Sequence, residues 1–243
     1  MYNKIYEYNE NFFKKINTYE KAYWLGFIMA DGYVFRRNDK SNHTGVRIRL
    51  SVKDKSHLEK LNEDISSNKP IKVVKNYGIY KNSNDLAEFY IPSIKLVNDL
   101  NNLGFINGNK TGKEFLIKFE DNNYTKNFIL GLFDGDGCVL SYQSYSKRDN
   151  KYRTLYEWQI VSSKQILEEI QEFLLSQICD LKFQKISKNS NKKNNKLYRL
   201  RIGNRNSIKS IYEYLYLDKC SNSILQRKYS IFKEIYENLS KLT

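Results

Sequence analysis

The sequence has little of the chemistry that cross-links chains or holds soft metals. Among its 243 residues are three cysteines, Cys138, Cys179 and Cys220, and no Cys-x-x-Cys pair. An odd number of widely separated cysteines argues against both a disulfide framework and a zinc site. Histidine occurs twice, at His43 and His57, which is too few for a catalytic centre built on several histidines. Any metal must therefore be a hard cation bound by oxygen atoms.

Long apolar runs are also missing. The longest uncharged apolar stretches, around residues 22–30 and 128–133, are far shorter than the roughly 20 residues that a membrane-spanning helix needs. The N-terminal stretch MYNKIYEYNENFFKK carries charges where a signal peptide has its apolar core. We therefore expect no membrane association and an intracellular protein, either in the cytoplasm of a bacterium or phage-infected cell or in an organelle.

Positive charge is what the sequence has in excess. Lysine and arginine number 41 against 27 acidic residues, so the formal net charge is +14 at pH 7. Folding does not require such an imbalance, which favours a polyanionic partner. Nucleic acid fits this charge better than an anionic membrane surface, because the chain lacks a membrane-binding apolar segment.

Two segments of the chain repeat one pattern. FILGLFDGDGCV (residues 128–139) aligns without a gap with YWLGFIMADGYV (residues 23–34), and both carry Asp-Gly after an apolar stretch. A single Asp-Gly is most simply a turn or a helix C-cap. The two copies lie 105 residues apart, from Asp31 to Asp136, and share the apolar body as well, which a cap alone does not need. The repeat predicts two similar halves, residues 1–114 and 115–243.

The repeated segments are predicted to be buried helices whose last turn carries a carboxylate. The negative end of the helix dipole disfavours Asp136 there by roughly 0.3–1 kcal/mol, and a nearby cation would reverse the sign. Gly26 with Ala30, and Gly131 with Gly135, give each helix a face of small residues at i, i+4 spacing. Such faces allow two helix backbones to approach closely.

Each half is predicted to follow its motif helix with two strands, a helix, two strands and a final helix. In the first half, residues 46–53 alternate between apolar and basic or polar side chains, which is typical of a half-buried strand. Its other elements are a helix capped by Ser56 with Glu59, strands at residues 71–75 and 86–91, and a helix capped by Ser93 and ended by Gly104. In the second half we expect strands at residues 139–145, 156–161, 181–186 and 197–202, and helices through residues 166–173, 207–216 and 224–239. Residues 106–127 are expected to link the halves, and residues 187–196 to form a polar loop.

The paired segments resemble the motifs of the LAGLIDADG homing endonucleases, in the form that carries two motifs in one chain. The resemblance implies an α+β fold of two pseudo-symmetric αββαββα halves, with the motif helices packed at the interface and antiparallel sheets forming a DNA-binding saddle. It also implies a monomer without an obligate protein partner, which hydrolyses both strands of a long double-stranded DNA site and is associated with an intron or intein. The sequence departs from the family pattern at Met29, where many relatives have an acid.

The resemblance implies that Asp31 and Asp136 are the catalytic, metal-binding acids. The carbonyl groups of Ala30 and Gly135 would supply further oxygen ligands. The implied cation is Mg²⁺, which suits carboxylate and phosphate oxygens, and Mn²⁺ is expected to substitute for it. Asp134, which stands where the first copy has Met29, is interpreted as a structural or capping acid.

Basic residues near the metal in this family assist water activation or stabilise charge on the phosphate. By resemblance, Lys110 in GFINGNKTG and Lys228 in ILQRKYSIF are the catalytic candidates. Lys53 and Lys164, each just ahead of a helix, are second candidates. In so basic a chain, a solvated or phosphate-positioning lysine is an equally good interpretation of each one.

Side chains on and near the predicted strands are expected to enter the major groove of DNA, where arginine pairs with guanine and glutamine with adenine. The candidates for DNA contact are Arg36, Arg37, Arg47, Arg49, Lys53, Lys72, Tyr90, Gln159, Lys164, Lys182, Gln184, Arg199 and Arg201. For each one the alternative is a phosphate contact or a solubilising surface residue. The alternative function is a non-cleaving RNA maturase or DNA-binding regulator on the same fold, with intron RNA as a partner. Such a protein has no reason to keep both Asp31 and Asp136, which favours the endonuclease.

Overall fold

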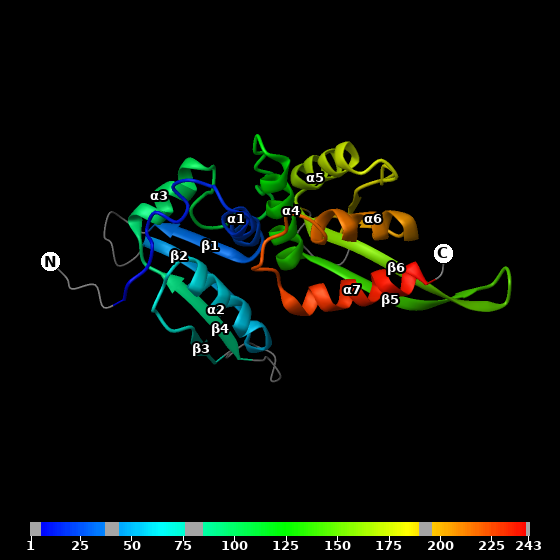
Figure 1. Ribbon diagram of the computed structural model, residues 1–243, viewed down its shortest axis with the longest axis horizontal. Helices are drawn as coiled ribbons and strands as arrows, with labels where there is room; N and C mark the ends of the chain where they lie inside the picture. Colours follow the sequence, from blue (N-terminus) through cyan, green and yellow to red (C-terminus); the bar gives the residue numbers. More distant parts are fainter. Residues whose placement is uncertain (1–5, 37–43, 76–84, 190–195, 242–243) are drawn as a thin grey trace.

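A pair of helices forms the centre of the molecule. The computed structural model describes residues 6–36, 44–75, 85–189 and 196–241 (Figure 1). The central helices are α1 (Tyr19–Asp31) and α4 (Asn122–Asp136), which pack directly against each other. A four-stranded antiparallel sheet lies on either side of this pair (Figure 1). Among the described residues, no helix is both long and apolar enough to cross a membrane.

The first half continues from α1 directly into its sheet. Strand β1 (Gly32–Arg36) pairs with β2 (Thr44–Ser51), and a short 3₁₀ helix, η2 (Val52–Asp54), leads into α2 (Lys55–Asp64). The half is completed by β3 (Lys72–Val74), β4 (Leu86–Ile91) and α3 (Ile94–Asn102). The sheet order is β1-β2-β4-β3, and all neighbouring strands are antiparallel.

The second half repeats this topology. Its strands are β5 (Gly137–Ser146), β6 (Lys151–Ser162), β7 (Ser187–Lys188) and β8 (Tyr198–Ile202), in the order β5-β6-β8-β7. Its further helices are α5 (Lys164–Gln177), α6 (Arg205–Tyr216) and α7 (Gln226–Ser240). The predicted α+β fold of two similar halves with paired motif helices is therefore confirmed.

Two boundaries in the first half differ from the prediction. β2 ends at Ser51, because the Ser51 hydroxyl caps η2 by accepting a hydrogen bond from the Lys53 N–H at 3.4 Å. Ser56 does not cap α2, since the helix begins two residues earlier than such a cap requires, at Lys55 with Asp54 in the N-cap position. Ser93 does cap α3 as predicted, by accepting a hydrogen bond from a backbone N–H of the first turn at 3.2 Å.

The predicted linker, residues 106–127, is too long at its C-terminal end. Helix α4 begins at Asn122, where the Asp121 side chain accepts a hydrogen bond from a first-turn N–H at 2.8 Å. Lys126 and Asn127 are buried within α4, because their side chains hold the loop between α6 and α7. The Asn127 amide, for example, donates to the Lys219 carbonyl at 2.8 Å. The sequence places these polar residues in the linker because nothing local reveals their distant partner.

Residues 181–186 do not form the predicted strand. Among the described residues between α5 and β8, only Ser187 and Lys188, which form β7, pair with β8. The Gln184 N–H donates to the Gln171 side chain on α5 at 2.6 Å, so this backbone group is satisfied by a helix rather than by a strand. The loop predicted at residues 187–196 accordingly begins with the two residues of β7, and residues 190–195 lie outside the described part of the chain.

Each sheet buries one face and leaves the other open. Along β4, Ala87, Phe89 and Ile91 are buried and alternate with partly exposed residues. Helices α2 and α3 pack against the first sheet, and α5, α6 and α7 pack against the second. The β5–β6 hairpin extends well beyond the other strands of its sheet (Figure 1). The open faces are therefore the surfaces that remain for a large partner.

Candidate functional site

Glycines let α1 and α4 touch backbone to backbone. A Cβ added to Gly26 would lie 1.8 Å from a carbonyl oxygen of α4, and one added to Gly131 would lie 1.9 Å from the Tyr23 carbonyl oxygen. Nearer the helix ends, a Cβ on Gly135 would lie 2.2 Å from the Cβ of Ala30. The small-residue faces predicted from the sequence do pack together, so the C-terminal ends of the two helices meet.

This packing brings together Asp31 and Asp136, the last residues of α1 and α4. The Asp31 carboxylate lies beside the α4 backbone, with Oδ2 3.3 Å from the position that a Cβ on Gly135 would take. The pKa of Asp136 is raised to about 7, first by burial and then by the charge of Asp31. Burial also raises the pKa of Asp31. Carboxylates in this arrangement repel each other unless a proton or a cation neutralises them.

The glycines that follow these acids do not end the helices in the left-handed conformation. Gly32 and Gly137 have φ of −76° and −96°, which any residue adopts. Their lack of a side chain matters for space instead, because a Cβ on Gly137 would lie 2.2 Å from the Phe133 ring. Gly32 and Gly137 do stand at the C-cap positions, where their N–H groups donate to the carbonyls of Ile28 and Phe133, but their backbone is extended. Close packing, and not a left-handed cap, therefore explains why glycine is repeated at this position.

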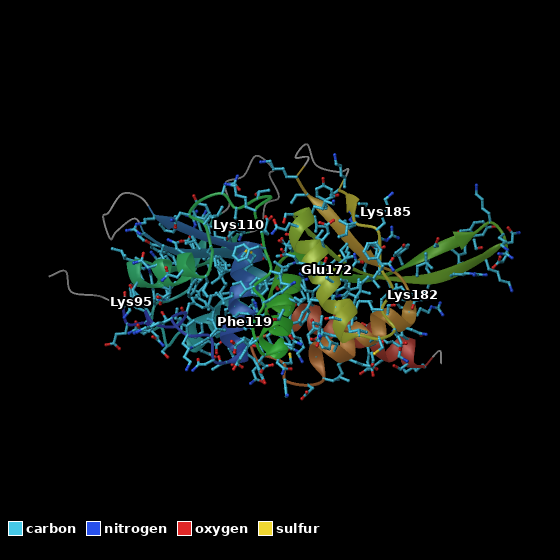
Figure 2. The ribbon with its side chains drawn as sticks, turned by 90° about the horizontal axis from the view of Figure 1, so that it is seen from above. Lys95, Lys110, Phe119, Glu172, Lys182 and Lys185 are labelled. Carbon is cyan, nitrogen blue, oxygen red and sulfur yellow. The ribbon has the colours of Figure 1, made fainter. Side chains whose placement is uncertain are left out.

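Two lysines occupy equivalent positions at the ends of the motif helices. Lys110 Nζ donates to the carbonyls of Ile28 and Gly32, each at 2.6 Å. Lys228 Nζ makes the corresponding pair of hydrogen bonds at the end of α4, at 2.9 and 2.5 Å. Figure 2 shows Lys110 beside the central helix pair. Each ammonium group thus lies at the negative end of a helix dipole, where a cation is stabilising.

The two lysines differ in the hydrogen-bond donors that they have left. An ammonium group has three N–H donors. Lys228 uses all of them, because it also donates to the Gly135 carbonyl at 3.2 Å. Lys110 uses two within the described part of the chain, so one N–H remains for a ligand. Burial lowers the pKa of Lys110 to about 8, although the charges of Asp136 and Asp31 oppose this, and burial also lowers the pKa of Lys228.

The donor set at the helix ends suits a hard cation. In the described ranges, no group of three or more His, Cys, Asp or Glu side chains converges on a metal position. A cation bound by Asp31 and Asp136 must then complete its shell with carbonyl, phosphate or water oxygens, as Mg²⁺ commonly does. The Gly135 carbonyl, predicted as a ligand, already accepts a hydrogen bond from Lys228. Ala30, whose carbonyl was also predicted as a ligand, lies opposite Gly135 across the helix interface.

Asp134 belongs to a separate, buried network. It accepts hydrogen bonds from the Tyr23 hydroxyl at 2.6 Å and from the Leu225 N–H at 2.8 Å, and the Tyr23 oxygen lies 3.1 Å from His57 Nε2. Burial raises the pKa of Asp134 to about 6 and lowers that of His57 to about 3. The network joins both motif helices to α2 and to the start of α7, which supports a structural interpretation of Asp134.

Most of the predicted DNA-contact residues lie on the open sheet faces. They are Arg47, Arg49, Lys72 and Tyr90 in the first sheet and Gln159, Arg199 and Arg201 in the second. These side chains differ in the residues that they contact. Arg49 and Arg201 form ion pairs with Glu88 and Glu157, each at 2.6 Å. Arg199 donates to the Asn189 side chain at 3.4 Å.

The remaining candidates lie elsewhere. Arg36 ends β1 and donates to the Asn98 side chain at 3.2 Å, Lys53 lies in η2, and Lys164 begins α5 and pairs with Glu168 at 3.1 Å. The placement of Lys182 and Gln184 on a strand face is wrong, because that segment is not a strand; Figure 2 shows Lys182 on the outer part of the second half. Arg37 lies outside the described residues.

Sequence reasoning missed two features near the motif helices. Tyr33 and Phe35 project from the open face of β1 and alternate with the buried Gly32 and Val34. The run Tyr33-Val34-Phe35 has no apolar and polar alternation, so the sequence held no signal that separates the two faces. The Arg227 guanidinium donates to both carboxylate oxygens of Asp54, at 3.0 and 2.9 Å, and so joins the two halves. No spacing rule pairs residues so far apart in the sequence.

Comparison with known proteins agrees with this geometry. Residues 129–238 match the model of the family described as LAGLIDADG endonuclease. No curated protein sequence is significantly similar to the chain.

Solved structures share the fold over nearly the whole chain. The I-LtrWI LAGLIDADG homing endonuclease bound to target DNA is 16% identical, with a TM-score of 0.58, over 92% of this chain and 91% of that one. I-SmaMI bound to an uncleaved DNA target in the presence of calcium ions is 15% identical, with a TM-score of 0.62, over 94% and 92%. The LAGLIDADG meganuclease I-AabMI bound to uncleaved DNA is 12% identical, with a TM-score of 0.59, over 93% and 91%.

The fold and the helix-end aspartates define an α+β protein of two motif-bearing halves. The resemblance to the LAGLIDADG homing endonucleases is confirmed, by sequence over residues 129–238 and by fold over most of the chain.

Proposed function

We propose that this chain is a metal-dependent, site-specific DNA endonuclease that hydrolyses one phosphodiester in each strand of a long duplex target. The observation that carries the proposal is the meeting of Asp31 and Asp136 at the ends of paired helices, with a lysine at each end. A protein that only binds nucleic acid gains nothing from two buried acids placed together, where burial, and then the charge of Asp31, raises the pKa of Asp136. The non-cleaving maturase or regulator is therefore the weaker alternative.

The residues at the helix ends divide the chemistry between them. Asp31 and Asp136 would hold Mg²⁺, or Mn²⁺ in its place, with substrate and water completing the shell. When bound, such a cation supplies polarisation of the scissile phosphate and a more acidic water. Lys110 keeps one N–H that can stabilise negative charge on the phosphate, while Lys228 holds the end of α4 and positions Asp136.

The open sheet faces would hold the DNA. The net charge of +14 and the arginines on these faces favour a polyanionic duplex, and the two sheets lie on either side of the acids. We assign residues 1–114 and 115–243 to the two halves and propose that one chain suffices, because it already contains both motif helices. Association with an intron or intein belongs to the same proposal.

The test compares binding and cleavage on one target. A duplex selected from a randomised library by binding in Ca²⁺ would be incubated with Mg²⁺, with Mn²⁺ and with excess chelator. We expect cleavage of both strands in either metal and none in chelator. Asp136→Asn should retain binding and lose cleavage of both strands, and Asp31→Asn should do the same, because each removes one ligand charge.

Asp180→Asn provides a matched control, since Asp180 is an exposed acid outside the helix ends. Native cleavage by either helix-end variant, or undiminished cleavage in chelator, would contradict the proposed mechanism. Sequence-specific binding without cleavage by the unmodified protein would favour the regulator.

A further inference from the structure

Arg47 and Gln159 occupy the same position in the two halves. In the first sheet Gly32 pairs with Ile48 and Tyr33 with Arg47; in the second, Gly137 pairs with Ile160 and Cys138 with Gln159. Each side chain therefore lies opposite the residue that directly follows a motif Asp-Gly. Both side chains lie on the open sheet faces. Each is on the strand that pairs with the strand directly following a motif aspartate.

The neighbours of Arg47 are aromatic rather than acidic. Its guanidinium carbon lies 5.3 Å from the centroid of the Tyr33 ring and 6.0 Å from that of Phe35. These rings stack at 5.8 Å, and Phe35 stacks at the same distance on Tyr90, the cross-strand partner of Arg47 on its other side. Two rings thus form a platform under the Arg47 guanidinium group, and the third ring, Tyr90, supports Phe35 and has the Lys69 ammonium 4.3 Å from its own centroid.

Arg47 keeps its hydrogen-bond donors for a ligand. Within the described residues no carboxylate pairs with it, whereas Arg49 and Arg201 are each neutralised by a glutamate at 2.6 Å. An arginine that lies over aromatic rings is held by cation–π attraction, and its in-plane N–H groups stay available. Its side chain is also partly ordered before binding, which lowers the entropy cost of a bidentate contact.

We propose that Arg47, positioned by Tyr33 and Phe35, recognises a guanine in the major groove of the half-site bound by the first sheet. Guanine presents the O6 and N7 acceptors that match two N–H groups of a guanidinium. Gln159 at the equivalent position cannot make this contact, so the guanine requirement is confined to one half-site and the target is asymmetric close to the cleavage centre. This inference rests on the proposed DNA binding but not on cleavage.

The experiment is a selection of duplexes from a randomised library by binding in Ca²⁺, followed by sequencing, for the wild type and for four variants. We expect one guanine in the wild-type consensus to lose roughly 10- to 100-fold of its enrichment with Arg47→Ala. Arg47→Gln should shift that position towards adenine. Lys95→Ala is the control, because it removes an exposed basic residue of α3, on the covered side of the same sheet, and it should leave the preference for this guanine intact.

Phe35→Leu tests the platform separately, because it removes a ring without removing a donor. A positioning role predicts a weaker preference for guanine with unchanged affinity for non-specific duplex. Intrinsic fluorescence of the buried Trp24 and Trp158 verifies that each variant is folded.

The inference is overturned if Arg47→Ala keeps the full guanine preference, or if it weakens binding to all sequences by one common factor, as a phosphate contact would. It is also overturned if the wild type selects no sequence. Selection of the guanine by a protein that does not cleave would leave the inference standing and refute only the proposed endonuclease.

Discussion

Replacing Lys228 by methionine tests what holds the end of the second motif helix. Methionine keeps an unbranched apolar stem and removes the ammonium group, which donates to the carbonyls of Phe133, Gly135 and Gly137 at 2.9, 3.2 and 2.5 Å. A hydrogen bond from a charged donor contributes about 1.5–3 kcal/mol. The three bonds share one buried ammonium whose desolvation offsets part of this, so we expect a loss of about 3 kcal/mol.

Such a loss is large beside a typical domain stability of about 5–15 kcal/mol. Urea unfolding followed by tryptophan fluorescence measures it, because Trp24 and Trp158 are fully buried, one in each half. Lys233→Met is the matched control on the same helix: Lys233 is exposed and 3.9 Å from its partner Glu237, so we expect a change below about 0.5 kcal/mol.

The comparison with Lys110→Met separates structure from catalysis. Lys110 makes two carbonyl hydrogen bonds and keeps one donor, so its variant should lose less stability and more of the cleavage rate than Lys228→Met. If Lys228→Met unfolds within about 0.5 kcal/mol of the wild type, its three contacts do not hold the helix end and the reasoning fails.

Three further predictions follow from the helix interface. Gly131→Ala places a Cβ 1.9 Å from the Tyr23 carbonyl oxygen and should lower the free energy of unfolding in urea by more than about 3 kcal/mol. Gly203→Ala is the control and should be nearly neutral, because its Cβ would meet no atom nearer than 3.7 Å. Equal effects of the two substitutions would contradict the close packing of the helices. In the folded protein the pKa of Asp136 is raised to about 7, so the metal-free protein should lose stability as the pH rises from about 4 through 7. The Mg²⁺ affinity measured by calorimetry should increase over the same range. An affinity that is constant between pH 5 and 8 would argue against Asp136 as a ligand. Asp134→Asn puts an amide where two donors meet a carboxylate and should cost about 1–3 kcal/mol in thermal or urea unfolding while the folded fraction still cleaves; native stability combined with lost cleavage would assign Asp134 to the catalytic centre instead.

The sequence by itself determined the plan of the molecule. Two copies of one apolar segment ending in Asp-Gly are enough to predict two equivalent halves, each with a buried helix that has a face of small residues. These conclusions depend on periodicity and on residue spacing, which are local properties of the chain. The pairing of the two helices and the meeting of Asp31 with Asp136 came from the resemblance to the LAGLIDADG homing endonucleases. Ser93 as a helix cap and the alternating β2 strand were predictable for the same reason.

Only the tertiary structure decided which residues serve the site. The interpretation of residues 106–127 as linker failed because Lys126 and Asn127 are satisfied by the loop between α6 and α7, about 90 residues away in the sequence. The strand predicted at residues 181–186 failed because a glutamine on α5 accepts the hydrogen bond that a strand would have taken.

The same holds for the charged residues. Arg47 and Arg49 are indistinguishable as alternating basic positions of β2, yet one lies over aromatic rings and the other pairs with Glu88. Lys110 and Lys228 are likewise equal candidates in the sequence, and only the carbonyls around each ammonium show that one has a donor left. Periodicity fixes which face a side chain takes, but its hydrogen-bond partners come from segments that the fold, and not the local pattern, brings beside it.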